Sequence, residues 1–176
     1  MKAIFLDRDG TVIEEVNYLN SFEKLKIFPF SKTSIKILKN LNFKIFLITN
    51  QSGVARGYFS EEFVIKINSY LCDKLNIDDF FYCPHHPDEN CDCRKPKIGM
   101  ILNAKKKYPE IELNKSYIIG DKEIDVITGK NAGLKSILVL TGYGKDYLNS
   151  SKADFIVKNL YYASILINSI ENAKCK

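Results

Sequence analysis

Two acidic motifs in this sequence have a spacing that suits metal binding and nucleophilic chemistry. The first motif, Asp7 and Asp9, comes just after one apolar run. The second comes just after another apolar run and consists of Asp121 and, four residues later, Asp125. Alternate residues of an extended segment point the same way, so Asp7 and Asp9 are expected to face one point, where a hard cation such as Mg²⁺ would relieve their repulsion. One carboxylate can then be a nucleophile while the other transfers protons. The alternatives are an acidic surface turn and, for Asp125, a helix-start acid.

Two further segments carry groups that could bind an anion. Residues 49–53 follow an apolar run, and their hydroxyls, side-chain amides and glycine-freed backbone N–H groups suit phosphate oxygens. Residues 94–97 place Arg and Lys before a helical pattern at 98–107, and fixed cations beside a helix N-terminus form an anion site. Taken singly, the first segment is equally a polar loop with a helix cap, and the second a solvated basic loop.

A cluster of cysteine and histidine residues lies at 83–93. Cys83-x-His85 and Cys91-x-Cys93 supply four ligands, the number that a structural tetrahedral zinc site requires, and His86 is a rival ligand. The cluster is expected to bind metal, because the chain has five cysteines and no export signal. Such a site would hold the loop that carries the basic segment 94–97. The alternative is a set of reduced free thiols.

The composition is that of an ordinary globular protein of one domain. The chain has 176 residues, 45% apolar and 27% charged, with a net charge of +5, which excludes intrinsic disorder and fibrous proteins. The first residues reach two acids after four apolar residues, too few for a signal peptide, and no run is long enough to span a membrane. We therefore expect a cytoplasmic protein that does not bind membranes, with residues 1–176 in one domain and a zinc loop at about 82–97.

Short apolar strands alternate with helical patterns along the chain. This alternation predicts an α/β fold with a doubly wound, mostly parallel sheet, in which ligands bind at the carboxyl ends of the strands. Only 37 residues, 12–48, separate the first two motifs, so we expect no cap domain. The strands are expected at 3–6, 44–49, 117–119, 136–140 and 155–157, and the helices at 31–42, 60–75, 98–107, 123–132 and 160–172.

The order of these motifs resembles that of the haloacid dehalogenase-like (HAD-like) phosphohydrolases. Asp-x-Asp, then Thr, then Lys, then Gly-Asp-x-x-x-Asp match the four motifs of that superfamily, each at a strand end or helix start. Within its histidinol-phosphatase-like branch, the chain is similar to the D-glycero-D-manno-heptose-1,7-bisphosphate 7-phosphatase family from about residue 3 to about residue 143. The segments that carry this similarity are Phe5-Leu6-Asp7-Arg8-Asp9-Gly10-Thr11, Thr49-Asn50-Gln51-Ser52-Gly53-Val54-Ala55-Arg56-Gly57, Tyr82-Cys83-Pro84-His85-His86-Pro87, Cys91-Asp92-Cys93-Arg94-Lys95-Pro96 and Gly120-Asp121-Lys122.

The resemblance implies a role for each matching residue. Asp7 would attack phosphorus and form an aspartyl-phosphate, and Asp9 would protonate the leaving oxygen and then activate water. Thr49 and Lys95 would hold the phosphoryl oxygens. The resemblance also implies a Mg²⁺ site formed by Asp7, the backbone carbonyl of Asp9 and Asp121; a Zn²⁺ site formed by Cys83, His85, Cys91 and Cys93; and substrate contacts from Asn17, Tyr18, Asn50, Gln51, Ser52, Arg94 and Lys122. It assigns no role to Arg56 or Asp125.

The function that the resemblance implies is Mg²⁺-dependent removal of the 7-phosphate from a heptose 1,7-bisphosphate, on the route to nucleotide-activated heptose for lipopolysaccharide and other surface glycans. The sequence leaves two alternatives open: a histidinol-phosphate phosphatase, and a non-enzymatic phospho-acceptor or zinc-clasped binding module. A second acid two residues after the phosphorylated one argues against a phospho-acceptor, whose phosphate must persist. No aromatic-rich basic stripe supports nucleic-acid binding. We expect a monomer whose partner is a small sugar phosphate.

Overall fold

The computed structural model describes residues 1–173, and its centre is one parallel sheet. In these residues six strands lie in the order β3-β2-β1-β4-β5-β6, and every neighbouring pair is parallel. The predicted doubly wound α/β fold is therefore confirmed. The strands are β1 (Lys2–Leu6), β2 (Phe43–Asn50), β3 (Asp79–Cys83), β4 (Tyr117–Gly120), β5 (Lys135–Val139) and β6 (Phe155–Val157).

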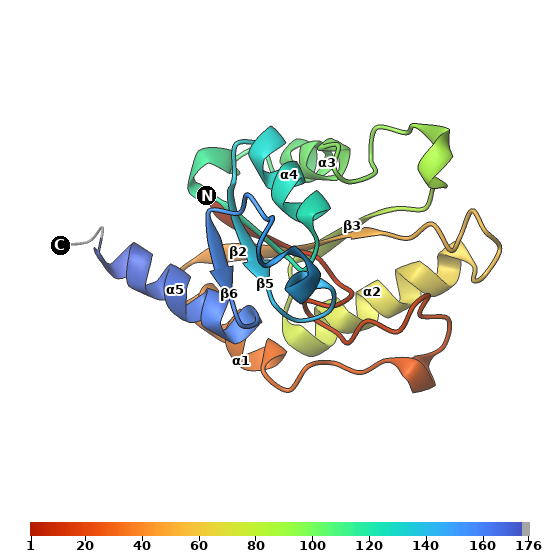
Figure 1. Ribbon diagram of the computed structural model, residues 1–176, viewed down its shortest axis with the longest axis horizontal. Coiled ribbons are helices and arrows are strands. Elements are labelled where there is room, and N and C mark those ends of the chain that lie inside the picture. Colours follow the sequence, from red (N-terminus) through yellow and green to blue (C-terminus); the bar gives the residue numbers. More distant parts are fainter. Residues whose placement is uncertain (174–176) are drawn as a thin grey trace.

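Helices cover both faces of the sheet (Figure 1). One face packs against α1 (Ser31–Asn40), α2 (Glu61–Leu75) and α5 (Leu160–Ala173), and the other against α3 (Gly99–Lys107) and α4 (Glu123–Asn131). These bounds agree with the sequence patterns to within two residues at each end. None of the helices in residues 1–173 combines the length and the apolar character needed to cross a bilayer.

The two-sided cover explains why the central strands are apolar throughout. In β1, Ile4 and Leu6 belong to the core beneath α1, α2 and α5, whereas Ala3 and Phe5 belong to the core beneath α3. All four side chains are fully buried. A strand in the middle of such a sheet has no solvent-facing side, so its sequence does not alternate between polar and apolar residues.

One strand was missed by the sequence analysis. Residues 79–83, which precede and enter the expected irregular stretch at 82–97, form β3 at the edge of the sheet, paired only with β2. Its residues Asp79 to Tyr82 are half-buried, and only Cys83 is fully buried. Its residues Phe80, Phe81, Tyr82 and Cys83 form a short apolar run that was a usable strand signal, but residues 82 and 83 were assigned to the irregular stretch.

Loops with short 3-10 turns connect several of the sheet elements. Between β1 and β2 the chain forms a loop with one 3-10 turn, η1 (Phe22–Lys24), followed by α1. Between β2 and α3 lie α2, β3 and a second 3-10 turn, η2 (Pro87–Glu89). The carboxyl ends of the central strands are therefore flanked by loops.

Phe46 offers a test of the core between the sheet and α3. It is fully buried, and its ring centroid lies 5.5 Å from that of Phe5 and 5.0 Å from that of Tyr108. We expect Phe46→Ala to lower the free energy of unfolding by about 3–5 kcal/mol in urea titrations, because it leaves a cavity. Leu102→Ala, at a side chain on α3 that is 51% exposed, should change it by less than about 0.5 kcal/mol. Equal effects would contradict this description of the core.

Candidate active site

A cleft of about 790 Å³, including space open to solvent, lies at the carboxyl ends of the strands. β1 pairs with β2 on one side and β4 on the other, so the chain order reverses at β1, which is where parallel α/β sheets bind ligands. The cleft brings together eleven of the predicted residues: Asp7, Asp9, Asn17, Tyr18, Thr49, Asn50, Gln51, Ser52, Arg94, Lys95 and Lys122. Asp125 also lines it.

Three carboxylates form a buried cluster in the floor of the cleft. Asp7 and Asp121 come from the ends of the paired strands β1 and β4, and Asp125 from the first turn of α4; an oxygen of each lies within 4.8 Å of the others. Asp7 N donates to the carbonyl of Ile119 at 2.9 Å, which extends the pairing of the two strands into the site. A side chain at Gly10 would collide with Asp121, so glycine permits the close approach of this loop.

Burial and mutual repulsion make the ionised form of this cluster unfavourable. Burial raises the pKa of Asp7 well above its usual range, Lys95 opposes the rise, and the neighbouring carboxylates add to it. Burial also raises the pKa of Asp121 to about 7, although the Tyr143 N–H lowers it. Among the described residues, Asp121 Oδ1 has no hydrogen-bond partner. A buried carboxylate oxygen without a partner and two nearby carboxylates fit a divalent cation such as Mg²⁺, which prefers oxygen ligands.

Lys95 places its ammonium group inside this cluster. Its Nζ donates to Asp7 Oδ1 at 2.5 Å, to Asp125 Oδ1 at 2.6 Å and to the Ile48 carbonyl at 3.1 Å. Burial alone would lower the pKa of Lys95, but the charges of Asp125 and Asp7 outweigh burial and raise it. The lysine is therefore charged, and it faces the position where a phosphoryl group would meet Asp7.

Asn50 and Asp125 hold this arrangement together. The Lys95 N–H donates to Asn50 Oδ1 at 3.0 Å, and Asn50 Nδ2 donates to the Lys95 carbonyl at 3.2 Å. Asp125 accepts from Lys95 through one oxygen and from the Lys122 N–H, at 3.1 Å, through the other. Asp125, which had no assigned role, thus connects the lysine loop to the start of α4, and Asn50 grips the lysine backbone from β2.

Asp9 does not follow the extended geometry expected from its spacing. The chain turns after Asp7, where the N–H groups of Val12 and Ile13 donate to the Arg8 carbonyl. As a result, the Asp9 carboxylate faces the end of β2, where it accepts from Gln51 Nε2 at 3.0 Å and from Thr49 Oγ1 at 3.4 Å. Its side chain is outside the cluster of the other three carboxylates. The two acids of the motif therefore occupy different surroundings, which suits different chemical roles.

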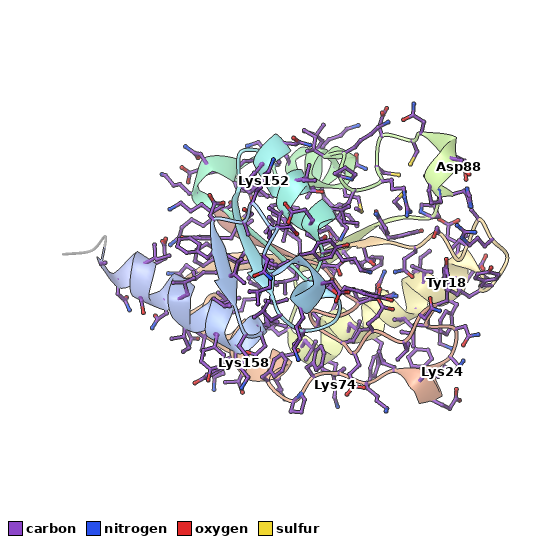
Figure 2. The ribbon with its side chains drawn as sticks, viewed as in Figure 1. Tyr18, Lys24, Lys74, Asp88, Lys152 and Lys158 are labelled. Carbon is purple, nitrogen blue, oxygen red and sulfur yellow. The ribbon has the colours of Figure 1, made fainter. Side chains whose placement is uncertain are left out.

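The outer part of the cleft is cationic and aromatic. Lys122 Nζ lies 3.3 Å from Glu15 Oε2 and 4.4 Å from the centroid of the Tyr143 ring. Tyr18 has a positive φ of 68° and packs edge-on against Tyr58 at 4.8 Å. Figure 2 shows Tyr18 and Asp88, which belongs to the cysteine loop, at the same end of the molecule. A second anionic or hydroxylated part of a substrate would meet these groups.

The sequence analysis missed three polar residues that line the cleft: Arg8, Glu15 and Tyr143. Arg8 stands between the two acids of its motif, and the sequence analysis gave it no role of its own. A permanently charged side chain at the end of a buried strand must find a partner, and this was a usable signal. The other two belong to loops without a pattern. In contrast, the Arg56 side chain is exposed and does not line the cleft.

The four predicted zinc ligands come together beside the cleft. Cys83 Sγ lies 3.4 Å from Cys91 Sγ and 3.5 Å from His85 Nδ1, and Cys93 Sγ lies 3.2 Å from His85 Nδ1. Bonds of about 2.3 Å in a tetrahedral zinc site place sulfur atoms about 3.8 Å apart, so small adjustments would accommodate the ion. His86 is outside the cluster, with its Nδ1 3.2 Å from Asp88 Oδ2.

Comparisons with known proteins agree with this geometry. Residues 92–163 match a family model described as HAD-hydrolase-like. The D-glycero-beta-D-manno-heptose-1,7-bisphosphate 7-phosphatase of Pasteurella multocida is 36% identical over 97% of this chain and 99% of its own length. The D-glycero-alpha-D-manno-heptose-1,7-bisphosphate 7-phosphatase of Photorhabdus laumondii is 39% identical over 81% of this chain and 85% of its own length.

A solved structure gives the same result. The D,D-heptose 1,7-bisphosphate phosphatase from B. bronchiseptica, complexed with magnesium and phosphate, superimposes with a TM-score of 0.88, at 30% identity over 97% of this chain and 99% of that chain. Identity of this degree over nearly the whole length shows common family membership. The chain belongs to the D-glycero-D-manno-heptose-1,7-bisphosphate 7-phosphatase family of HAD-like hydrolases.

Proposed function

We propose that the chain is a Mg²⁺-dependent phosphatase that removes the 7-phosphate of D-glycero-D-manno-heptose 1,7-bisphosphate through an aspartyl-phosphate, in nucleotide-activated heptose biosynthesis. The observation that carries this proposal is the buried Asp7 carboxylate, bound by Lys95 at 2.5 Å and facing the cleft. The relatives described above carry this activity in their names and share nearly the whole chain.

In this proposal Asp7 is the nucleophile and Lys95 the fixed cation beside it. The Lys95 ammonium would neutralise charge on the phosphoryl oxygens as they approach a carboxylate that would otherwise repel them. Thr49 Oγ1, at the end of β2, would donate a hydrogen bond to the same oxygens. Division of the hydrolysis into two displacements is covalent catalysis, which replaces one difficult step by two easier ones.

Asp9 would transfer protons in both displacements. It would protonate the sugar oxygen as that oxygen leaves, and would then deprotonate the water that attacks the aspartyl-phosphate. Its position outside the carboxylate cluster supports this role, because the side chain points along the wall of the cleft toward Thr49 and Gln51. Gln51, proposed as a substrate contact from the sequence, also orients the acid.

Mg²⁺ would be held by Asp7, Asp121 and the backbone carbonyl of Asp9, and the closeness of Asp125 supports a cation in the same place. When bound, the ion lowers the repulsion between an anionic nucleophile and an anionic ester. Asp121 would serve only as a ligand, because it is fully buried behind Gly10 and Gly142 and does not line the cleft.

The second phosphate and the sugar would lie in the outer cleft. Arg94 and Lys122 are the cations available there, and Asn17, Tyr18, Asn50 and Ser52 add polar contacts. Hydrogen bonds from such groups discriminate between substrates better than apolar contacts, because an unmatched buried polar group is costly. Two cations in the cleft besides Lys95 favour a bisphosphate over the single phosphate of histidinol phosphate.

We further propose that Cys83, His85, Cys91 and Cys93 bind a structural Zn²⁺, that residues 1–176 are one capless domain, and that the protein acts as a cytoplasmic monomer. Four protein ligands leave no open position, as in structural zinc sites. Thiols in this arrangement persist in a reducing compartment. The loop from Cys93 leads directly into Arg94 and Lys95, so the metal would fix two cations of the cleft.

The proposed reaction predicts a clear preference in a substrate panel. Phosphate release should show a higher kcat/KM for the heptose 1,7-bisphosphate than for histidinol phosphate. Asp7→Asn should lower turnover by at least about a thousandfold, because the amide is not a nucleophile. A preference for histidinol phosphate would overturn the substrate, and a stable phosphorylated wild type without turnover would favour the binding module.

The raised pKa of Asp121 predicts a pH-dependent response to Mg²⁺. Folding raises the pKa of Asp121 from 3.8 to about 7. Such a carboxyl group stabilises the folded state fully below pH 3.8, the unfolded pKa, and this stabilisation is lost as the pH rises through about 7, the folded pKa. Saturating Mg²⁺ should therefore raise the Tm little at pH 5.5 and by about 5–10 °C at pH 8. Asp121→Asn should be more stable than the wild type at pH 8 without Mg²⁺ and should lose the response. Equal Tm shifts at both pH values would contradict the cluster.

The zinc proposal predicts a loss that metal analysis can measure. Purified protein should contain about one Zn²⁺ per chain, held by the four ligands, and Cys91→Ser should lose it, with a lower Tm and a lower kcat on the bisphosphate. Cys72→Ser is the matched control, because Cys72 lies on α2, outside the cluster. Full zinc content in Cys91→Ser, or none in the wild type, would contradict the proposal.

A further inference from the structure

We propose that Arg8 and Asn68 are positioning residues for proton transfer: Asn68 on α2 anchors the Arg8 guanidinium, and Arg8 holds the Asp9 carboxylate in the orientation that the leaving oxygen requires. This inference rests on the function proposed above and deepens it, because it concerns the proton transfer assigned to Asp9. Asn68 does not line the cleft, so this role gives helix α2 a part in the site.

Arg8 binds both oxygens of the Asp9 carboxylate. Its Nε donates to Asp9 Oδ2 at 3.1 Å, and its Nη2 donates to Asp9 Oδ1 at 3.1 Å. Two parallel bonds of this kind fix the plane of a carboxylate as well as its position, which a single ammonium contact cannot do. The rotation of the Asp9 side chain is thus set by the arginine.

The rest of the guanidinium is held from two other elements. Nη1 donates to Asn68 Oδ1 at 3.1 Å, and Nη2 donates to Gln51 Oε1 at 2.9 Å. Gln51 in turn donates from Nε2 to Asp9 at 3.0 Å and to Thr49 at 2.7 Å. The acid, the arginine and the amide therefore form a closed ring of hydrogen bonds, and Asn68 ties this ring to the helix.

Burial makes the position of this ring specific. Arg8 is 1% exposed and Asn68 is fully buried. A buried guanidinium must be paired, because an uncompensated charge in the interior is strongly destabilising. If the only role of Arg8 were to pair a buried charge, it would need no contact with both oxygens of a side chain at the surface of the cleft. Asp9 is such a side chain, because it is 16% exposed.

Only the oxygen of the Asn68 side-chain amide makes a hydrogen bond among residues 1–173. Its Oδ1 accepts from Arg8, whereas its Nδ2 has no hydrogen-bond partner among residues 1–173. The position therefore uses an acceptor oxygen directed at Arg8. Asn68 lies in the middle of α2, on the face of the sheet shared with α1 and α5 (Figure 1), and so joins the helix to the strand end that carries the acid.

Orientation matters here because proton transfer depends steeply on geometry. A general acid must lie within hydrogen-bond distance of the oxygen that it protonates, and a displacement of about 1 Å can cost on the order of a hundredfold in rate. Without the Asn68 acceptor, Nη1 of Arg8 loses its contact with α2, so the guanidinium can shift within its plane about its remaining contacts with Gln51 and Asp9, and Asp9 shifts with it. The loss should be largest where the leaving oxygen needs a proton most.

Two phosphate esters with different leaving groups separate this role from a structural one. The heptose bisphosphate loses an alkoxide, which needs a proton as the bond breaks, whereas p-nitrophenyl phosphate loses a stable phenolate, which does not. The quantity to compare is kcat/KM, because it includes only the steps up to departure of the leaving group and excludes hydrolysis of the aspartyl-phosphate.

We expect Asn68→Leu, which keeps the branching of the side chain and removes the acceptor, to lower kcat/KM about tenfold on the bisphosphate and less than about threefold on p-nitrophenyl phosphate. Arg8→Lys should show the same selectivity, because an ammonium cannot hold both carboxylate oxygens. Asn68→Asp keeps the acceptor and should stay within about threefold of the wild type on both esters. Asp9→Asn should show the largest selective loss.

Leu71→Ala is the matched control, because Leu71 is a buried apolar residue of the same helix. It should lower the Tm without substrate selectivity. The proposal would be overturned if Asn68→Leu lowered kcat/KM equally on both esters. It would also be overturned if Asn68→Asp lowered kcat/KM on the bisphosphate as much as Asn68→Leu does. If Asn68→Leu does not fold, Arg8→Lys and Asn68→Asp decide the question.

The outcome is separable from the proposed function. A wild type that hydrolyses p-nitrophenyl phosphate and not the bisphosphate would contradict the proposed substrate alone, and histidinol phosphate then supplies the alkyl ester for the same comparison. A wild type active on the bisphosphate, with selective loss in Asp9→Asn and none in Asn68→Leu or Arg8→Lys, would contradict the positioning role alone.

Discussion

The repulsion among three buried carboxylates is the constraint on which this structure depends. Asp7, Asp121 and Asp125 lie within 4.8 Å of one another, and Lys95 is the cation placed among them. One positive charge does not balance three ionised carboxylates, and burial together with this imbalance raises the pKa values of Asp7 and Asp121. In the proposed function, a divalent cation and the Lys95 ammonium group would together neutralise the site, and this balance would let a phosphate approach.

Lys95 is held by four parts of the chain: the end of β1, the end of β2, α4 and the cysteine loop, with Asp7 of β1's end accepting from its ammonium group. The end of β2 contributes Asn50 to its backbone and the Ile48 carbonyl to its ammonium group, and α4 contributes Asp125. The cysteine loop, clasped at its base by the contacts around His85, delivers the lysine into the cleft. This many attachments are needed because a long flexible side chain on a loop would otherwise lose much of its precision of placement.

Much of the site could be predicted from the sequence, because its parts are coded locally. Apolar runs define the central strands, and parallel strands must end at one edge of a sheet, so the residues after each run had to meet there. The grouping of Asp7 with Asp121, and the gathering of the four zinc ligands, follow from that rule and from the ligand spacing. The helices α1 to α5 were likewise predicted to within two residues, and α1 and α2 in particular carry apolar side chains at helical spacing.

Other features were decided only by the tertiary structure. The edge strand β3 depends on pairing with β2, and the orientation of Asp9 depends on a turn that the i, i+2 spacing did not reveal. The contact of Arg8 with Asn68 joins residues 60 positions apart. The sequence determined which chemical groups reach the cleft, whereas the packing of α2 and the loops against the sheet decided where each group points, because side-chain direction depends on neighbours that are distant in the chain.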